Sequence, residues 1–292
     1  MNNSPIHIPF KNHQNPKSAF DIIRLEEVLR REGLDHSPEQ LHVVEFYMII
    51  LIEEGSGVHT IDFTDYPCEK GTLLTVRKDQ LHGFTDGRNM KGIMLLFQDE
   101  FVISYLEKLE AQQTLQLFNE LLGAPKIQLS APQFQEMASL LQRMNQEYFK
   151  VNDAYSLSIV RSELHVLIMK LYRIKTILHP QIKNRSYLED FIAFQTLVEK
   201  NVTTFSKVLD YAKMLGISSK TLNTVTRSIV NKSAKAFIDE IYLMQIKRLL
   251  INTDDSVKEI AYSVGFEEVS NFYKYFKRGV QLTPEQFRKE KK

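Results

Sequence analysis

The sequence predicts an α+β chain in which a small β-barrel with flanking helices precedes an all-helical domain. Residues 41–97 are rich in β-branched and aromatic residues and are interrupted by Gly, Pro and Asp, which is typical of short strands joined by tight turns. From about residue 98 onward, apolar residues recur at helical spacing. A length of 292 residues is enough for two domains. We therefore expect domains at 1–178 and 187–292, joined by a polar linker at 179–186.

The composition is that of a soluble globular protein, with 43% hydrophobic and 25% charged residues. The longest apolar run, 46–52, is far shorter than the roughly 20 residues of a membrane helix. The N-terminus lacks the basic and apolar pattern of a secretory signal. The single cysteine, Cys68, excludes an internal disulfide and suits a reducing compartment. Together these features predict a cytoplasmic protein without membrane contact.

Local signals place the individual elements. We expect a helix at 18–34, turns at 54–57, 65–67, 69–71 and 85–87, and a last buried strand at 92–97. Helical apolar stripes follow at 101–122, 134–148 and 159–178.

One pattern of two short helices occurs twice in the C-terminal domain. In the second copy, Ser256 and Glu259 form a capping box, Gly265 ends the first helix, and Phe272 and Phe276 face inward from the next. The first copy, 205–238, has the same features in the same order: an alanine in the first helix, a glycine in the turn, and a second helix that begins at a serine. Its predicted inward residues are Val208, Leu209, Ala212, Leu222, Val225 and Ile229. A long helix at 235–251 joins the copies.

Two helices joined by a short glycine-containing turn can place the second helix in the major groove of DNA. The outward side chains of the second helices are the hydroxyls, amides and cations that contact phosphates and base edges. The candidate DNA-binding residues are Ser219, Lys220, Thr221, Asn223, Thr224, Arg227, Ser270, Asn271, Tyr273, Lys274 and Lys277. Residues 185–292 hold 18 Lys and Arg against 13 Asp and Glu, a basic balance that favours DNA as the partner.

The C-terminal domain resembles the DNA-binding domain of the AraC/XylS family. The matching residues are Ile260-Ala261, Val264-Gly265-Phe266, Ser270-Asn271-Phe272, Phe276-Lys277, Thr283-Pro284 and Phe287-Arg288. The resemblance implies about seven helices, with recognition helices at about 219–230 and 269–278. Where the family usually has glycine, arginine, alanine and phenylalanine, this chain has Gln281, Ile241, Ile246 and Thr226.

The strand-rich segment resembles the cupin-like sensor domain of the same family. The matching segments are His42 with 45–47, 55–57 with 61–63, 71–73 and 80–82. A small barrel can hold one ligand among its inward side chains. The candidate ligand-binding residues are His42, Glu45, His59 and His82. Val44 interrupts the His-x-His pair of metal-binding cupins, so we expect no metal and no other cofactor.

The resemblance implies a bacterial, nucleoid-associated transcription regulator. Its expected partners are promoter DNA, RNA polymerase, an unknown small-molecule effector and a second copy of the chain bound through helices in 98–178. An alternative is a metal-dependent cupin enzyme with a helical appendage, which metal analysis would identify. A third reading is a helical scaffold that never touches DNA, which substitution of Arg227 or Asn271 would distinguish. No catalytic residues are expected.

Overall fold

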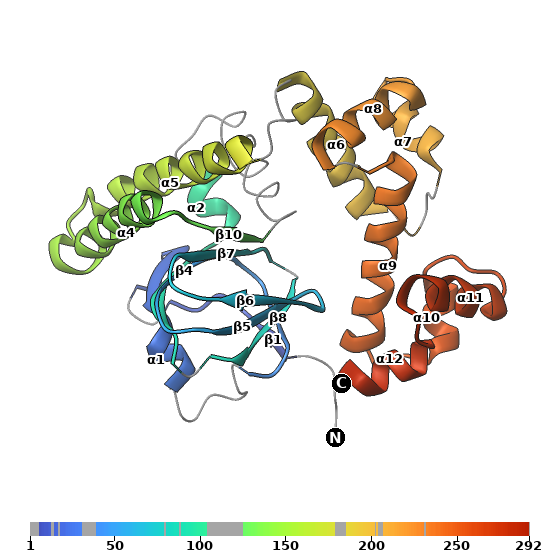
Figure 1. The fold of residues 1–292 in the computed structure, drawn as a ribbon, viewed down its shortest axis with the longest axis horizontal. Helices are drawn as coiled ribbons and strands as arrows, with labels where there is room; N and C mark the ends of the chain where they lie inside the picture. The colour runs from blue at the N-terminus through green and yellow to red at the C-terminus, as the bar shows by residue number, and fades with distance from the viewer. Residues whose placement is uncertain are drawn as a thin grey trace. The chain divides into compact units, whose positions relative to one another are not determined.

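The computed structural model describes residues 6–12, 15–16, 18–30, 39–78, 80–87, 89–103, 125–178, 185–201, 203, 207–230 and 232–291. The chain divides into two compact units, one within residues 6–178 and the other within 179–292 (Figure 1). The first is β-rich with helices and the second is helical, which confirms the predicted α+β class. Helix α6 begins at Arg185, inside the range predicted as linker, and the preceding residues 179–184 lie outside the described part.

Two five-stranded sheets form the body of the first unit. One sheet has the order β1-β3-β8-β5-β6 and the other β10-β7-β4-β9-β2. Neighbouring strands are antiparallel, except that β1 runs parallel to β3. The strands are β1 (Ile6–Ile8), β2 (Phe20–Arg24), β3 (His42–Val44), β4 (Tyr47–Glu54), β5 (Gly57–Ile61), β6 (Thr64–Cys68), β7 (Thr72–Val76), β8 (Leu81–Asp86), β9 (Lys91–Phe97) and β10 (Lys126–Gln128).

Strand β4 is apolar along most of its length because both of its faces are buried. Met48 and Ile50 point between the two sheets, where they pack with residues of both. Ile49 and Leu51 point the other way and pack against helices on the outer face of their sheet. Since side chains alternate along a strand, a strand buried on both faces appears in the sequence as a continuous apolar run.

The outer face of the sheet that contains β4 is covered by helices. These are α4 (Ala131–Gln146), its π-helical extension η1 (Glu147–Val151) and α5 (Ser156–Leu178), which lie side by side in Figure 1. Their apolar stripes share one buried cluster with the sheet. Two short helices, α1 (Leu25–Arg30) and α2 (Asp99–Ile103), complete the described part of the unit.

Several local predictions in this unit were wrong. The segment predicted as a helix at 18–34 contains β2 before the short helix α1, because residues 20–24 pair along their whole length with β9. The predicted turn at 65–67 lies within β6, and the chain instead turns at Asp62 and Phe63. Strands β1 and β10 were not predicted, and residues 104–122 of the stripe at 101–122 lie outside the described part.

Seven helices form the described part of the second unit, as the family resemblance implies. Within this unit, the long helix α9 connects the α7–α8 pair to the α10–α11 pair (Figure 1). The helices are α6 (Arg185–Asn201), α7 (Val208–Met214), α8 (Ser219–Val230), α9 (Ala234–Asn252), α10 (Val257–Ser263), α11 (Val269–Val280) and α12 (Pro284–Lys291). Among the described residues, no helix has the length and apolar character needed to cross a membrane.

Candidate nucleic-acid interface

Both copies of the repeated pattern fold as helix-turn-helix units. Gly216 and Gly265 follow the first helices with φ of +67° and +92°, a conformation that glycine adopts without steric cost. Ala212 and Ala261 are buried in the first helices, where a larger side chain has no room. The Ser256 capping box is present: its hydroxyl accepts from the Glu259 amide at 3.2 Å, and its own amide donates to the Glu259 carboxylate at 2.7 Å.

The inner face of α7 differs from the prediction at one position. Leu209 was expected inside, but it is 53% exposed, whereas Tyr211 is fully buried. Phe194 of α6 packs edge-on against the Tyr211 ring, with 5.7 Å between ring centroids. Since α6 lies outside the repeated pattern, comparison of the two copies could not reveal which residue of α7 it covers.

The second recognition helix, α11, separates an aromatic inner face from a polar outer face. Phe272 and Phe276 are fully buried. Its exposed polar side chains, which form no hydrogen bond or ion pair with other described residues, are Ser270, Asn271, Lys274 and Lys277. Tyr273 is half-buried, and its hydroxyl donates to the carboxylate of Glu285 on α12. This hydrogen bond raises the pKa of Tyr273 to about 12, and it engages the hydroxyl that was predicted to contact DNA.

Arg278 is a further candidate for DNA contact that sequence reasoning missed. It is exposed near the end of α11, with its guanidinium 5.6 Å from the centroid of the Tyr275 ring. The signal in the sequence was its position directly after Lys277, one helical turn beyond Lys274.

The first recognition helix, α8, has fewer polar side chains that are free of hydrogen bonds to other described residues. Lys220 and Arg227 are exposed and form no ion pair with other described residues. The Thr224 hydroxyl donates to the Lys220 carbonyl at 3.1 Å. The Thr221 hydroxyl lies 2.8 Å from that of Ser218, and Ser219 is half-buried. The Asn223 amide is engaged at both ends, donating to the Ser219 carbonyl and accepting from the Ala234 amide, each at 3.0 Å.

In the first unit, the β-barrel brings three of the four candidate ligand-binding residues together. His42, His82 and His59 lie on the adjacent strands β3, β8 and β5. Ring centroids are 4.2 Å apart for His42 and His82, and 5.2 Å apart for His59 and His82. Each is two residues before a side chain of the cluster between the sheets, so all three face the barrel interior. The sequence did not predict this proximity, because the three histidines lie far apart along the chain.

His59 has the least solvated position of the three. It is fully buried, and neither ring nitrogen has a hydrogen-bond partner among the described residues. Burial, together with the nearby His42, lowers the pKa of His59 to about 3, so this imidazole is neutral. His42 differs, because its Nδ1 lies 2.9 Å from the Gln40 carbonyl and must therefore be the donor.

Glu45 does not join these histidines. It follows β3 in a bend and is exposed, so its side chain points to solvent. Within the described ranges, no three His, Cys, Asp or Glu side chains are placed to hold a metal ion. Cys68 is buried near the cluster, and burial raises the pKa of its thiol to about 11.

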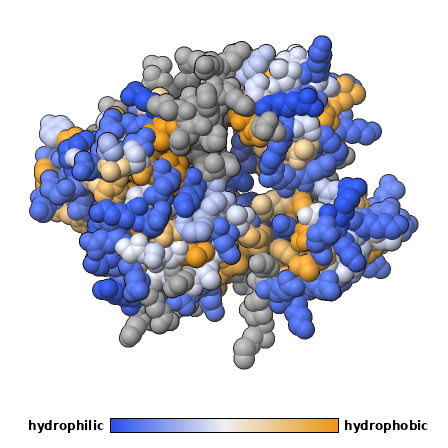
Figure 2. All heavy atoms as spheres, in the orientation of Figure 1, coloured by the Kyte–Doolittle hydropathy of each residue, from blue (hydrophilic) through white to orange (hydrophobic). Residues whose placement is uncertain are grey.

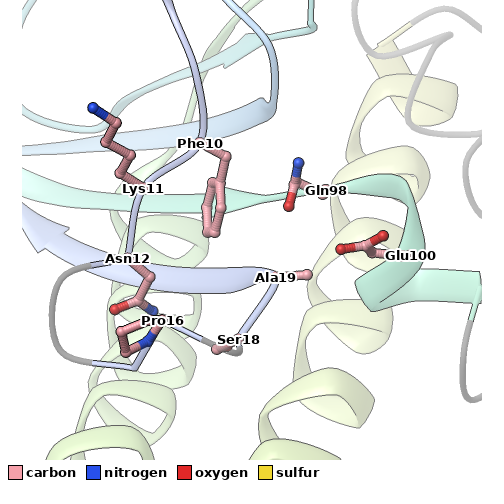
Figure 3. Close-up of a pocket in the computed structure, with 8 residues that line it drawn as sticks. All are labelled: Phe10, Lys11, Asn12, Pro16, Ser18, Ala19, Gln98 and Glu100. Atoms are coloured by element: carbon pink, nitrogen blue, oxygen red, sulfur yellow. The ribbon is translucent and has the colours of Figure 1, made fainter.

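A surface pocket of about 430 Å³ lies where the N-terminal segment passes the junction of β9 and α2 (Figure 3). Asn12 in its wall donates to the Phe20 carbonyl at 2.8 Å and to the Tyr148 hydroxyl at 2.6 Å. The polar N-terminal sequence carried no signal for this pocket. Its lining residues are Phe10, Lys11, Asn12, Pro16, Ser18, Ala19, Gln98 and Glu100.

Comparisons with known proteins match both units. Residues 26–155 match the family of AraC-like ligand binding domains, and residues 211–290 match a family of helix-turn-helix domains. The transcriptional activators RhaS and RhaR of Enterobacter sp. (strain 638) are each 23% identical to this chain. The RhaS match covers 86% of this chain and 87% of RhaS, and the RhaR match covers 85% and 86%.

Two solved structures are also similar. ToxT from Vibrio cholerae is 16% identical with a TM-score of 0.42, over 93% of this chain and 98% of ToxT. The C-terminal domain of the response regulator yesN from Fusobacterium nucleatum is 29% identical with a TM-score of 0.30, over 32% of this chain and 93% of that domain.

The chain carries two helix-turn-helix units whose exposed hydrogen-bond donors are not engaged by other described residues. It also carries a ligand-binding barrel, and together these features define a DNA-binding regulator. The chain belongs to the AraC/XylS family of transcriptional regulators, since both characteristic domains match in the family's order.

Proposed function

We propose that this protein regulates transcription by placing α8 and α11 in successive major grooves of promoter DNA. The observation that carries the proposal is the set of exposed donors on these helices that no other described side chain engages. By contrast, Lys232 and Lys235, which lie outside the recognition helices, are already paired with Glu240 and Asp239. Long unpaired cations suit phosphate contacts, whereas a free amide suits base edges.

The roles divide by chemistry. Asn271 is the best-placed base reader, because its amide can bond both N6 and N7 of adenine. Ser270 assists on the same exposed turn. Lys274 and Lys277 neutralise phosphates from α11, as Lys220 does from α8. Arg227 has the geometry either for phosphate or for guanine.

Selection of genomic fragments by the purified protein, followed by sequencing, tests the proposal and yields an operator. We then expect Asn271→Ala to weaken operator binding by about 1–3 kcal/mol and to relax the preference for one base. Lys277→Ala should lower the slope of log affinity against log salt by about 1. Lys232→Ala is the matched control, since it removes a cation of the same unit that is already paired. Failure to enrich any sequence would refute the proposal.

The proposed regulatory ligand is a small molecule that binds beside His42, His59 and His82. Among the described residues, neither buried ring nitrogen of His59 has a partner, which leaves hydrogen-bonding capacity that such a ligand would satisfy. The neutral imidazole of His59 favours a ligand with hydroxyl or amide groups. A thermal-shift screen of the intact protein should find compounds that stabilise it, and His59→Leu should remove the effect. An undiminished response in that variant would place the ligand elsewhere.

A homodimer is proposed through α5. Tyr155 at the turn before this helix and Ile159, Val166 and Met169 along it share one helical face and are between 41% and 73% exposed. Figure 2 shows hydrophobic patches among hydrophilic surface on the visible face of the molecule. Val166→Lys should shift the protein toward monomer in sedimentation experiments. Gln142→Lys, at an exposed position on α4, should not.

We further propose a cytoplasmic, nucleoid-associated regulator that works with RNA polymerase and is not an enzyme. The similar RhaS and RhaR proteins are activators, which supports activation as the direction. A reporter gene placed behind the selected operator measures the direction directly, and stoichiometric metal in the purified protein would reopen the enzymatic alternative.

A further inference from the structure

Asn223 was predicted as a DNA contact, but its amide lies in a junction between two helices. Its Oδ1 accepts from the backbone amide of Ala234, the first residue of α9, and its Nδ2 donates to its own helix at Ser219. The first amides of a helix have no acceptor within the helix. Ala234 is fully buried, so water does not replace Asn223 there. Turning this amide toward a base would leave a buried donor without a partner.

The second helix-turn-helix unit is attached to the same helix by two tyrosines. Tyr275 on α11 donates to the Asp239 carbonyl of α9 at 3.2 Å. Tyr242 on α9 donates to the Val264 carbonyl, in the turn of the second unit, at 2.5 Å. The two rings pack together with 5.5 Å between their centroids. The attachment points of both units on α9, Ala234 and 239–242, are thus separated by only about two helical turns.

We propose that Asn223, Tyr242 and Tyr275 are positioning residues that clamp both recognition helices onto α9, so that the protein accepts only one spacing between its two half-sites. One continuous helical segment of α9 separates the two attachment points. Asn223 fixes α8 and Tyr275 fixes α11, each through a directional hydrogen bond to α9, while Tyr242 holds the turn that precedes α11. Asn223 therefore controls where α8 meets the DNA and does not choose a base. This inference rests on the proposed function of α8 and α11 as DNA-binding helices.

The test compares binding of the intact protein to its selected operator and to operators with one base pair inserted or deleted between the half-sites. We expect the wild type to lose at least tenfold in affinity on either change. Asn223→Ala and Tyr275→Phe should reduce that penalty to threefold or less while leaving base preference in each half-site unchanged. Asn223→Asp keeps an acceptor for the Ala234 amide and should keep the full penalty. The spacing penalty is a ratio of two affinities of the same protein, so the effect of the added Asp charge on overall DNA affinity cancels.

Three results would overturn the clamp while leaving DNA binding intact: a wild type that tolerates both spacings, an Asn223→Ala protein that keeps the full spacing penalty, or one that changes base preference opposite α8. Tyr275→Phe removes a single hydroxyl and provides the answer if Asn223→Ala does not fold, as judged by circular dichroism. A protein that enriches no DNA refutes the proposed function, and the clamp with it.

Discussion

The fully buried His59 makes the stability of the first unit depend on pH. Its pKa is about 3 in the folded protein, against 6.5 for a solvated histidine in the unfolded chain, so only the unfolded chain binds a proton between these values. A depressed folded pKa contributes stability that is complete above about pH 6.5 and is lost as pH falls toward 3. The slope is about 1.4 kcal/mol per pH unit, so lowering the pH from about 8 to about 5 should cost about 2 kcal/mol through this residue alone.

Urea denaturation followed by far-ultraviolet circular dichroism measures this loss, since the protein contains no tryptophan for fluorescence. His59→Leu removes the titrating group, so the variant should lose about 2 kcal/mol less than the wild type between the two pH values. Other groups titrate in both proteins and cancel in the difference. His7→Leu, at an exposed histidine of β1, is the control and should behave as the wild type. Equal losses in wild type and His59→Leu would show that His59 is not held neutral by burial.

Three further predictions concern stability in other parts of the chain. Gln281 ends α11 with φ of +65°, so Gln281→Gly should raise the free energy of unfolding by about 0.5–1 kcal/mol, whereas Gln281→Ala should not. Ser256→Ala should lower it by about 1 kcal/mol through loss of the helix cap, and Ser256→Asp should restore most of that loss. Tyr148→Phe leaves the buried Asn12 amide without one acceptor and should cost about 1–3 kcal/mol, measured by urea titration; an unchanged midpoint would mean that water replaces the hydroxyl.

Short-range chemistry in the sequence determined much of this protein. The change from strand-like to helical periodicity at about residue 98 marked the end of the strand-rich segment, and the polar stretch at 179–186 marked where one unit gives way to the next. The turn glycines Gly216 and Gly265 and the capping box of Ser256 were identified correctly, because each depends on residues within one helical turn. The same spacing identified the exposed polar side chains of α11, since the burial of Phe272 and Phe276 dictates which residues face outward.

Only the tertiary structure decided features that depend on partners far along the chain. Residues 20–24 become a strand because β9 supplies their pairing, and Tyr211 replaces Leu209 inside because α6 covers it. Asn223 bonds the first residue of α9 and does not face outward, because the fold places the start of α9 beside it.

The histidines illustrate the same division. Their side chains were candidates in the sequence, but pairing of β3, β8 and β5 gathered His42, His82 and His59 and left Glu45 in solvent. Periodicity reports which face of an element is apolar. It contains no information about which distant element will cover that face, and that choice sets both burial and hydrogen-bond partners.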